Sequence, residues 1–361
     1  MRKKWSSVLA LVLVLALVAV FGAGCAKTTE DEGTTSEGEV LPGEGIKVGM
    51  VTDTNGLGDK SFNDAVWEGL EMARDELGVE IEVLESNEPA DYEPNIDQLA
   101  AAGYDIIFTV GFLFTDITPV KAEEYPDIVF GAVDQFFEDP PPNVAAMVFR
   151  ENEAAYLAGM LAAMVTTDPD FDERINPDPV IGFVGGMDIP PVEKFQAGYI
   201  AGARSVNPDI QVISAFVGNF DDQAKAKELA ISAIDQGADI VFQAAGLAGL
   251  GVIPACVEKG ALFIGVDADQ YQTAPESQDV ILTSALKKMQ QPVYSVIEDV
   301  VNDEFEGGVK SYGATEDAGG LAPFYNFDDA VTQEMRDALA EAEAGIKDGS
   351  IVVPSSRAEL E

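Results

Sequence analysis

The chain has 361 residues, with 64 Asp and Glu, 21 Lys and Arg and no His, and its formal net charge is −43. Such an acidic chain cannot neutralise phosphates, so nucleic-acid binding is excluded. Without His there is no Ser–His or Cys–His catalytic pair and no His metal ligand, and two Cys cannot form a zinc site. Because 47% of the residues are apolar, the acidity lies on a foldable chain whose length predicts two domains.

The acidic excess has two explanations, which the sequence leaves open. Carboxylates keep a surface hydrated in concentrated salt, where screening removes their mutual repulsion, so the charge fits a halophilic source. An ordinary acidic exported protein is the alternative. In both cases the charge describes the surroundings of the protein and not its activity.

The first 24 residues have the pattern of a lipoprotein signal peptide. A basic start at 2–4 precedes an apolar run over 8–21 that is too short to span a membrane comfortably. Small residues directly before Cys25 resemble a lipobox, although Gly22 stands where Leu or Val is usual; a plain signal peptide is the alternative. We expect lipidation of Cys25, an acidic flexible tether over 25–45, and a body held on the outer side of the cell membrane.

From Ile46 onward, short runs rich in Val and Ile alternate with stretches of helical periodicity, which predicts an α/β fold with parallel sheets. The segment Ser61–Leu77 is typical of an amphipathic helix, with Ser61 and Asp64 as a weak capping signature. The predicted strands are 46–51, 81–84, 106–110, 128–133, 180–184, 211–216, 240–243, 262–266 and 280–283.

The chain repeats itself after a polar stretch at 168–179. Residues 48–51 match 181–184 at an offset of 133, and Phe62 matches Phe195 at the same offset. Two similarly built lobes are therefore expected. We place the first lobe at 46–153 with about 286–308, the second at 154–285 with about 309–350, and a loose tail at 351–361.

Ligands of open α/β sheets bind outside the carboxyl ends of the strands. Phe62 and Phe195 would approach a cleft between the lobes from opposite sides, and carboxylates around them describe a slot for a flat ring bearing hydroxyl or amino groups. The residues at the predicted strand ends are Asp53, Gly111, Phe112, Asp134, Gly185, Gly186, Ala245, Gly246, Asp267 and Ser284.

Each of these residues also has a purely structural interpretation. Phe62 and Phe195 fit the ends of apolar helix stripes, and Asp53 would equally cap a helix or turn. Gly202, like Gly198, is expected to let a helix approach the sheet, and Cys256 to be a small buried core residue.

At this point several motifs resemble the basic membrane protein family of substrate-binding lipoproteins, the purine nucleoside receptors of ABC importers. The resemblance covers the anchor and nearly all of 46–325. The segments that carry it are Val51-Thr52-Asp53, Asp59-Lys60-Ser61-Phe62-Asn63, Gly182 to Met187, Glu193 to Tyr199, Asp235 to Asp239, Gly265 to Gln270 and Thr283 to Lys287.

The resemblance implies a two-lobed periplasmic-binding-protein fold of type I that closes over a nucleoside. It implies that Phe62 and Phe195 sandwich the base. Asp53 and Asn63 would bond the base, Asp267 and Lys287 the ribose, and Gly246 would let the backbone approach the ligand. The loop at 244–249 departs from the glycine-rich pattern of the family, which leaves its contacts open.

The resemblance further implies permease and ATPase subunits as partners, a monomer, no cofactor and no catalysis. Some relatives are thought to bind other flat molecules such as flavins. A ligand sensor is an alternative, and so, more remotely, is a calcium-dependent nucleoside hydrolase, for which Asp53 and Asp59 supply only two carboxylates.

Overall fold

A computed structural model describes residues 41–360 of the chain. The predicted signal peptide, Cys25 and the tether up to residue 40 lie outside the described residues. The last part of the predicted tether is instead ordered, because Gly43 N donates to Leu77 O at 2.8 Å. None of the helices between residues 41 and 360 is both long and apolar enough to cross a membrane.

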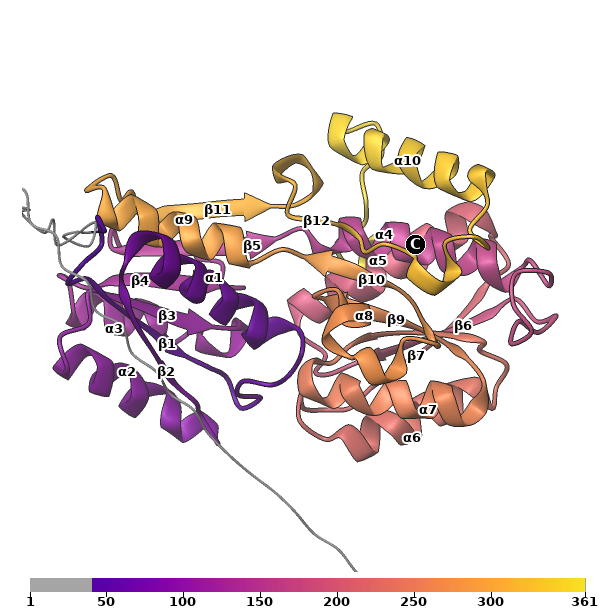
Figure 1. Cartoon of the computed structure of the whole chain (residues 1–361), viewed down its shortest axis with the longest axis horizontal. Coiled ribbons are helices and arrows are strands. Elements are labelled where there is room, and N and C mark those ends of the chain that lie inside the picture. Colours follow the sequence, from indigo (N-terminus) through magenta and orange to yellow (C-terminus); the bar gives the residue numbers. More distant parts are fainter. Residues whose placement is uncertain (1–40, 361) are drawn as a thin grey trace, which may run out of the picture. The chain divides into compact units, whose positions relative to one another are not determined.

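The first sheet has the strand order β2-β1-β3-β4-β5-β11, with all neighbouring strands parallel (Figure 1). Helices α1 and α9 cover one face, and α2 and α3 cover the other. The bounds are β1 Lys47–Val51, α1 Phe62–Leu77, β2 Glu80–Leu84, α2 Tyr92–Ala101, β3 Ile106–Val110, α3 Thr118–Glu124, β4 Val129–Val133, β5 Val144–Phe149, α9 Gln290–Val301 and β11 Gly308–Tyr312.

The second sheet repeats this order as β7-β6-β8-β9-β10-β12, and only β12 runs antiparallel to its neighbour β10. Helices α4, α5 and α10 pack on one face, and α6 and α7 on the other. The bounds are α4 Glu151–Thr166, β6 Val180–Gly185, α5 Pro190–Val206, β7 Gln211–Phe216, α6 Gln223–Ile234, β8 Ile240–Ala244, α7 Val252–Lys259, β9 Leu262–Asp267, α8 Gln270–Thr273, β10 Ile281–Lys287, β12 Gly319–Leu321 and α10 Gln333–Asp348.

These two parallel-dominant sheets confirm the predicted α/β architecture. Alternate strand residues supply the two faces of each sheet, so that Ile181 and Phe183 lie under α4 and α5 while Val184 lies under α6 and α7. Cys256 is fully buried in the latter cluster, as predicted, and burial raises the pKa of its thiol to about 12.

The chain passes between the lobes three times: after β5, after β10 and between β11 and β12. Arg150 ties the first and third crossings together, because its backbone N donates to Tyr312 O at 2.8 Å and its guanidinium pairs with Glu153 at 2.7 Å and Glu316 at 2.5 Å. These contacts brace the backbone that links the two lobes.

Two of the expected assignments are corrected by the structure. The range of about 309–350 was placed in the second lobe, and β12 and α10 do lie there, but β11 joins the first sheet by pairing with β5. The tail after residue 350 is not loose up to residue 360. Asn152 Nδ2 donates to Val353 O at 2.9 Å, and Arg357 pairs with Asp188 at 2.7 Å and Glu193 at 3.1 Å, so the tail is held against the starts of α4 and α5.

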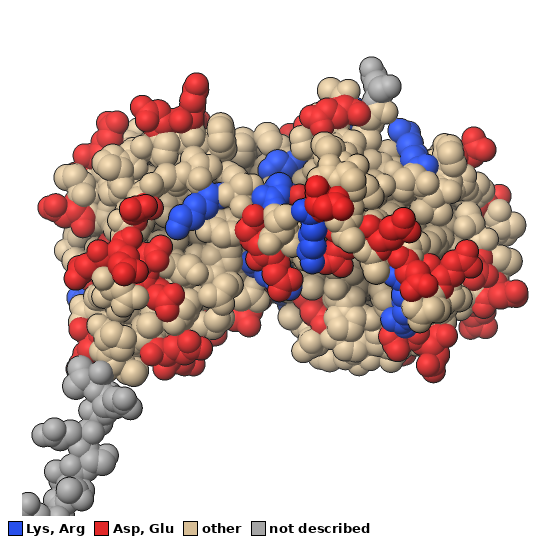
Figure 2. Space-filling model, turned by 90° about the horizontal axis from the view of Figure 1, so that it is seen from above, with Lys and Arg blue, Asp and Glu red and all other residues tan. Residues whose placement is uncertain are grey.

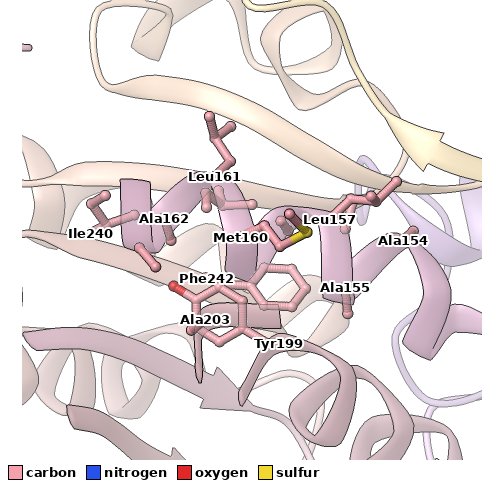
Figure 3. Packing of buried hydrophobic residues seen from close by; sticks show 14 of the residues in the cluster. Ala154, Ala155, Leu157, Met160, Leu161, Ala162, Tyr199, Ala203, Ile240 and Phe242 are labelled. Atoms are coloured by element: carbon pink, nitrogen blue, oxygen red, sulfur yellow. The ribbon is translucent and has the colours of Figure 1, made fainter. Parts of the chain in front are cut away.

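The core of the second lobe depends on close packing of α4 against α5. Figure 3 shows Leu157 and Met160 of α4 near Tyr199 of α5 and Phe242 of β8, whose ring centroid lies 5.0 Å from that of Tyr199. A Cβ atom on Gly202 would collide with the backbone carbonyl of Tyr156 in α4.

The α5 glycines therefore permit helix-to-helix contact, and their predicted role of letting the helix approach the sheet is wrong. A Cβ on Gly198 would collide with Asn152 O, and one on Gly159 of α4 with Tyr199 O. The helical period marked these glycines as packing residues. The partner of the α5 glycines is α4, and the periodicity within α5 cannot show which other helix packs against it.

We expect Gly202→Ala to destabilise the protein by roughly 1–3 kcal/mol, because a backbone carbonyl cannot move aside as a side chain can. Helix propensity acts in the opposite direction, favouring Ala by about 1 kcal/mol. Urea unfolding measures the net change. Gly319→Ala is the control, since its added Cβ would find no atom nearer than 3.7 Å. A Gly202→Ala variant as stable as the parent would contradict the tight contact.

Candidate functional site

A cavity lies between the two lobes, at the carboxyl ends of strands from both sheets, and its atom-free space of about 560 Å3 includes open solvent. Eight of the nine residues predicted for ligand binding line it, and Asn63 does not. The eight are Asp53, Phe62, Phe112, Asp134, Phe195, Gly246, Asp267 and Lys287.

Asp53 follows β1 and is only 5% exposed. Its Oδ1 accepts hydrogen bonds from Asn55 N at 3.1 Å and Asn63 Nδ2 at 3.0 Å, and its Oδ2 accepts one from Asn55 Nδ2 at 3.1 Å. Burial raises the pKa of Asp53 to about 6, although the bonds from Asn63 and Asn55 act in the opposite direction. Asn63 thus lies behind Asp53 and holds it in place.

Asp59 fixes the start of α1 and with it the position of Phe62. Its carboxylate accepts from Ser61 N at 3.0 Å and Asn63 N at 2.8 Å. The Ser61 side chain makes no capping hydrogen bond, so the predicted capping signature is wrong and the aspartate two residues earlier takes its place. Burial raises the pKa of Asp59 to about 6.

Asp134 and Asp267 occupy matching places in the two lobes. They are 133 residues apart, and each has a left-handed backbone, with φ of 59° and 62°, at the end of the fourth strand of its lobe. Asp134 Oδ2 lies 2.5 Å from Lys287 Nζ, whereas Oδ1 of Asp267 has no hydrogen-bond partner among residues 41–360. Burial raises the pKa of Asp267 to about 7.

Lys287 ends β10 and is the only Lys or Arg among the residues that line the cavity. Burial lowers the pKa of Lys287, but the charges of Asp134, Glu151 and Asp267 outweigh burial, so the net shift is upward. Its Nζ lies 5.0 Å from the centroid of the Phe62 ring and 4.9 Å from that of Phe149, within range of cation–π attraction.

The two interpretations of the aromatic residues are compatible in the structure. Phe195 is 4% exposed and stands edge-on to Phe242, at 6.0 Å and 71°, yet it also forms part of the cavity wall. Phe62 is half-buried against the first-lobe core and lines the cavity from that lobe. Each ring therefore belongs both to a core and to the site.

Sequence reasoning missed several lining residues, among them Asn55, Pro191 and Phe220. Phe220 lies in the loop after β7, so the rule of strand ends would have identified it. Asn55 is two residues beyond the predicted Asp53. Nothing in a Pro-Pro pair at the start of α5 indicates a cavity wall. Ser284, by contrast, was expected at a strand end but does not line the cavity. Its Oγ accepts a hydrogen bond from Gln270 N at 3.0 Å.

The lobes meet at the rim of the cavity. Lys60 Nζ pairs with Glu276 at 2.9 Å, and Thr273 Oγ1 donates to Lys60 O at 3.1 Å. Gly246 has φ +54°, and a Cβ there would come within 3.0 Å of Asn55 Nδ2 from the first lobe. A glycine at this position therefore allows the two lobes to approach closely.

Acidic side chains cover much more of the surface shown in Figure 2 than Lys and Arg do, in keeping with the net charge of −43. Between residues 41 and 360, no group of three or more acidic or Cys side chains is placed to hold a metal ion.

Two similar α/β lobes with an enclosed cavity between their strand ends define a periplasmic-type binding protein. The sequence profile of the family described as ABC transporter substrate-binding protein PnrA-like matches residues 46–356. The ABC transporter nucleoside-binding protein BmpA of Lactococcus lactis is 34% identical over 98% of this chain and all of that protein. An uncharacterized lipoprotein of Pyrococcus furiosus is 35% identical over 87% of this chain and 76% of that protein.

A solved ABC transporter solute-binding protein of Aeropyrum pernix covers 87% of this chain and 95% of its own, with a TM-score of 0.78 and 29% identity. The chain belongs to the basic membrane protein family, PnrA-like, of ABC transporter substrate-binding proteins. Members of this family bind solutes and are not enzymes, which confirms the predicted family and the expected lack of catalysis.

The raised pKa of Asp267 predicts a pH-dependent stability. A carboxyl whose pKa is about 7 when folded and near 3.8 when unfolded holds its proton more tightly in the folded chain, so its contribution is lost as pH rises toward 7. We expect Asp267→Asn to gain stability relative to the parent between pH 4.5 and 8, by up to about 4 kcal/mol, since one pKa unit is about 1.4 kcal/mol.

Urea unfolding of both ligand-free proteins across this pH range measures the difference. Asp222→Asn, at the exposed N-cap of α6, is the control for a carboxylate-to-amide change outside the cavity. A stability difference between Asp267→Asn and the parent that does not change with pH would mean that Asp267 stays ionised at low cost.

Proposed function

We propose that the cavity captures a purine nucleoside for an ABC importer. The observation that carries this proposal is that Phe62 and Phe195, one from each lobe, line the cavity together with the buried Asp267, whose Oδ1 accepts no hydrogen bond from residues 41–360. Aromatic walls suit a flat base, and carboxylates suit the N–H and O–H donors of a nucleoside. The nucleoside-binding relative in Lactococcus lactis supports this ligand class.

In this proposal the two rings stack on the base, and Asp53, held by Asn55 and Asn63, accepts hydrogen bonds from it. Asp267 and Lys287 bind the ribose hydroxyls, the first by accepting and the second by donating. Phe112 closes the first-lobe side of the cavity. Gly246 brings the backbone of the β8–α7 loop to the ligand.

The charge of the cavity favours a neutral ligand over a nucleotide. Three carboxylates, Asp53, Asp134 and Asp267, line it with Lys287, whose ammonium already pairs with Asp134. A phosphate would therefore meet more negative than positive charge in an enclosed space, where charge interactions are strong.

The same proposal assigns the protein's place in the cell. Lipoprotein relatives and the resemblance of the N-terminus to a lipobox support a monomeric body anchored through Cys25 on the outer side of the membrane, delivering ligand to permease and ATPase subunits. A calorimetric screen of inosine, adenosine, guanosine, riboflavin, ribose and AMP tests the ligand class. Binding of riboflavin or ribose without any nucleoside would overturn the proposal.

Removing one aromatic wall should weaken nucleoside binding. We expect Phe62→Ala to lower affinity by about 1–3 kcal/mol, the contribution of one base stack. Because Phe195 is buried in the core, Phe195→Leu is the suitable change there and should have a smaller effect in the same direction. Isothermal titration with inosine measures both, and Phe324→Ala, half-buried away from the cavity, is the control. Unchanged inosine affinity in both Phe62→Ala and Phe195→Leu would mean that the two rings only pack in the lobe cores and do not contact the ligand.

The pKa of Asp53, raised to about 6, predicts how binding depends on pH. Only the ionised carboxylate can accept a hydrogen bond from the base through Oδ2 while it also accepts those of Asn55 and Asn63, so wild-type affinity should fall as the pH drops below about 6. We expect Asp53→Asn to bind inosine at least tenfold more weakly than wild type at pH 7.5. The ratio of the two dissociation constants should become smaller toward pH 5. Titration of Asp267 affects both proteins alike and cancels in this ratio. A ratio independent of pH would exclude Asp53 as the titrating acceptor.

A further inference from the structure

A side chamber opens beside the ligand cavity and shares Phe112, Asp134 and Pro191 with it. Its atom-free space is about 840 Å3, part of which is open to solvent. Two further aromatic residues, Phe136 and Phe149, form its apolar walls. The chamber therefore borders the cavity at the three shared residues, next to the pair of Asp134 and Lys287.

The chamber contains one buried group that the contacts described so far leave unused. Glu151, the first residue of α4, has a side chain only 1% exposed, and neither of its carboxylate oxygens accepts a hydrogen bond from residues 41–360. Lys194 Nζ is 3.6 Å from Oε2, too far for a hydrogen bond, and donates instead to Phe149 O at 2.8 Å. Burial raises the pKa of Glu151, as expected for an acid without donors.

Phe136 supplies the second unusual feature. Its side chain follows the buried Gln135 in the β4–β5 loop and is 66% exposed, although large aromatic residues usually bury most of their surface. It stands at the chamber with Phe112, so an aliphatic group placed between them would cover both rings. The apolar walls and a carboxylate that has an ion pair with Lys194 but accepts no hydrogen bond from residues 41–360 together describe a site for a short aliphatic arm that ends in a hydrogen-bond donor.

We propose that the side chamber is a subsite for nucleosides that carry at the 5′ position a short aliphatic arm ending in an amine. This inference rests on the proposed function, which puts the ribose beside Asp134 and Lys287. The arm packs between Phe112 and Phe136, and the amine donates to Glu151. An anionic arm would find no net positive charge there, because Asp134 and Glu151 line the chamber with a single cation, Lys194.

The test uses calorimetry on the full body of the protein with four ligands. Adenosine is the reference, 5′-deoxy-5′-(methylthio)adenosine supplies an apolar arm, 5′-deoxy-5′-(2-aminoethylthio)adenosine adds the amine, and AMP supplies an anion. In the wild type we expect the aminoethylthio compound to bind at least as tightly as adenosine and about tenfold tighter than the methylthio compound. AMP should bind at least tenfold more weakly than adenosine.

Two variants separate the arm from the amine. In Glu151→Gln, the tenfold preference for the amine should shrink to about twofold. In Phe136→Ala, an exposed change that leaves folding intact, both arm-bearing ligands should weaken threefold or more relative to adenosine. Val120→Ala, an exposed change on α3, is the control that alters none of these ratios.

The outcomes distinguish this inference from the proposed function. If adenosine binds and both arm-bearing ligands bind more than tenfold more weakly in the wild type, the subsite is wrong and nucleoside capture stands. An amine preference that survives in folded Glu151→Gln also overturns the subsite. If no nucleoside binds at all, both proposals fall.

Discussion

The buried ion pair between Lys287 and Asp134 is the interaction on which the site depends. Lys287 comes from the second sheet and Asp134 from the first, and their side chains are 2% and 7% exposed. Taking both charges out of water is costly, and the pair repays that cost only when its geometry and neighbouring hydrogen bonds are good. Its effect on the cavity is selective. It neutralises one carboxylate and leaves Asp53 and Asp267 as the acceptors, with pKa values raised to about 6 and 7. The cavity is therefore built for a ligand that brings donors and no negative charge.

The two lobes have the same architecture, and each contributes corresponding residues to the site. Both sheets have the same strand order, and the cavity lies beyond the strand ends, where such sheets bind ligands. Asp134 and Asp267 occupy one place in this plan, and Phe62 and Phe195 another, near the starts of α1 and α5. The two lobes differ at a position that lines the cavity. Asp53, after β1, has Gly186 in the corresponding place after β6, so only the first lobe has an acid at this position.

This repetition explains which parts of the molecule could be predicted. The offset of 133 residues and the rule of strand ends identified the lobes and most of the polar lining, because both depend on local pattern. The crossings between lobes were not predictable in the same way. The apolar run 144–149 passes into α4 after Arg150 with no turn residue between strand and helix, so β5 was not recognised. Once β5 was missing, β11 had no visible partner in the first sheet. Residues such as Pro191 reach the cavity only through the tertiary placement of α5, which no local signal encodes.

The direct contacts at the rim are too weak to hold the lobes closed without a ligand. In periplasmic binding proteins the lobes close around the ligand by hinge motion. The rim pair of Lys60 and Glu276 is 32% and 64% exposed, and such pairs contribute only about 0–1 kcal/mol. Closure without ligand also brings Asp53, Asp134 and Asp267 into one enclosed space, where only Lys287 offsets their repulsion. A ligand that donates hydrogen bonds to these acids binds the closed state better than the open one, and this difference in affinity is what shifts the population. The same carboxylates therefore select the ligand and make closure depend on it.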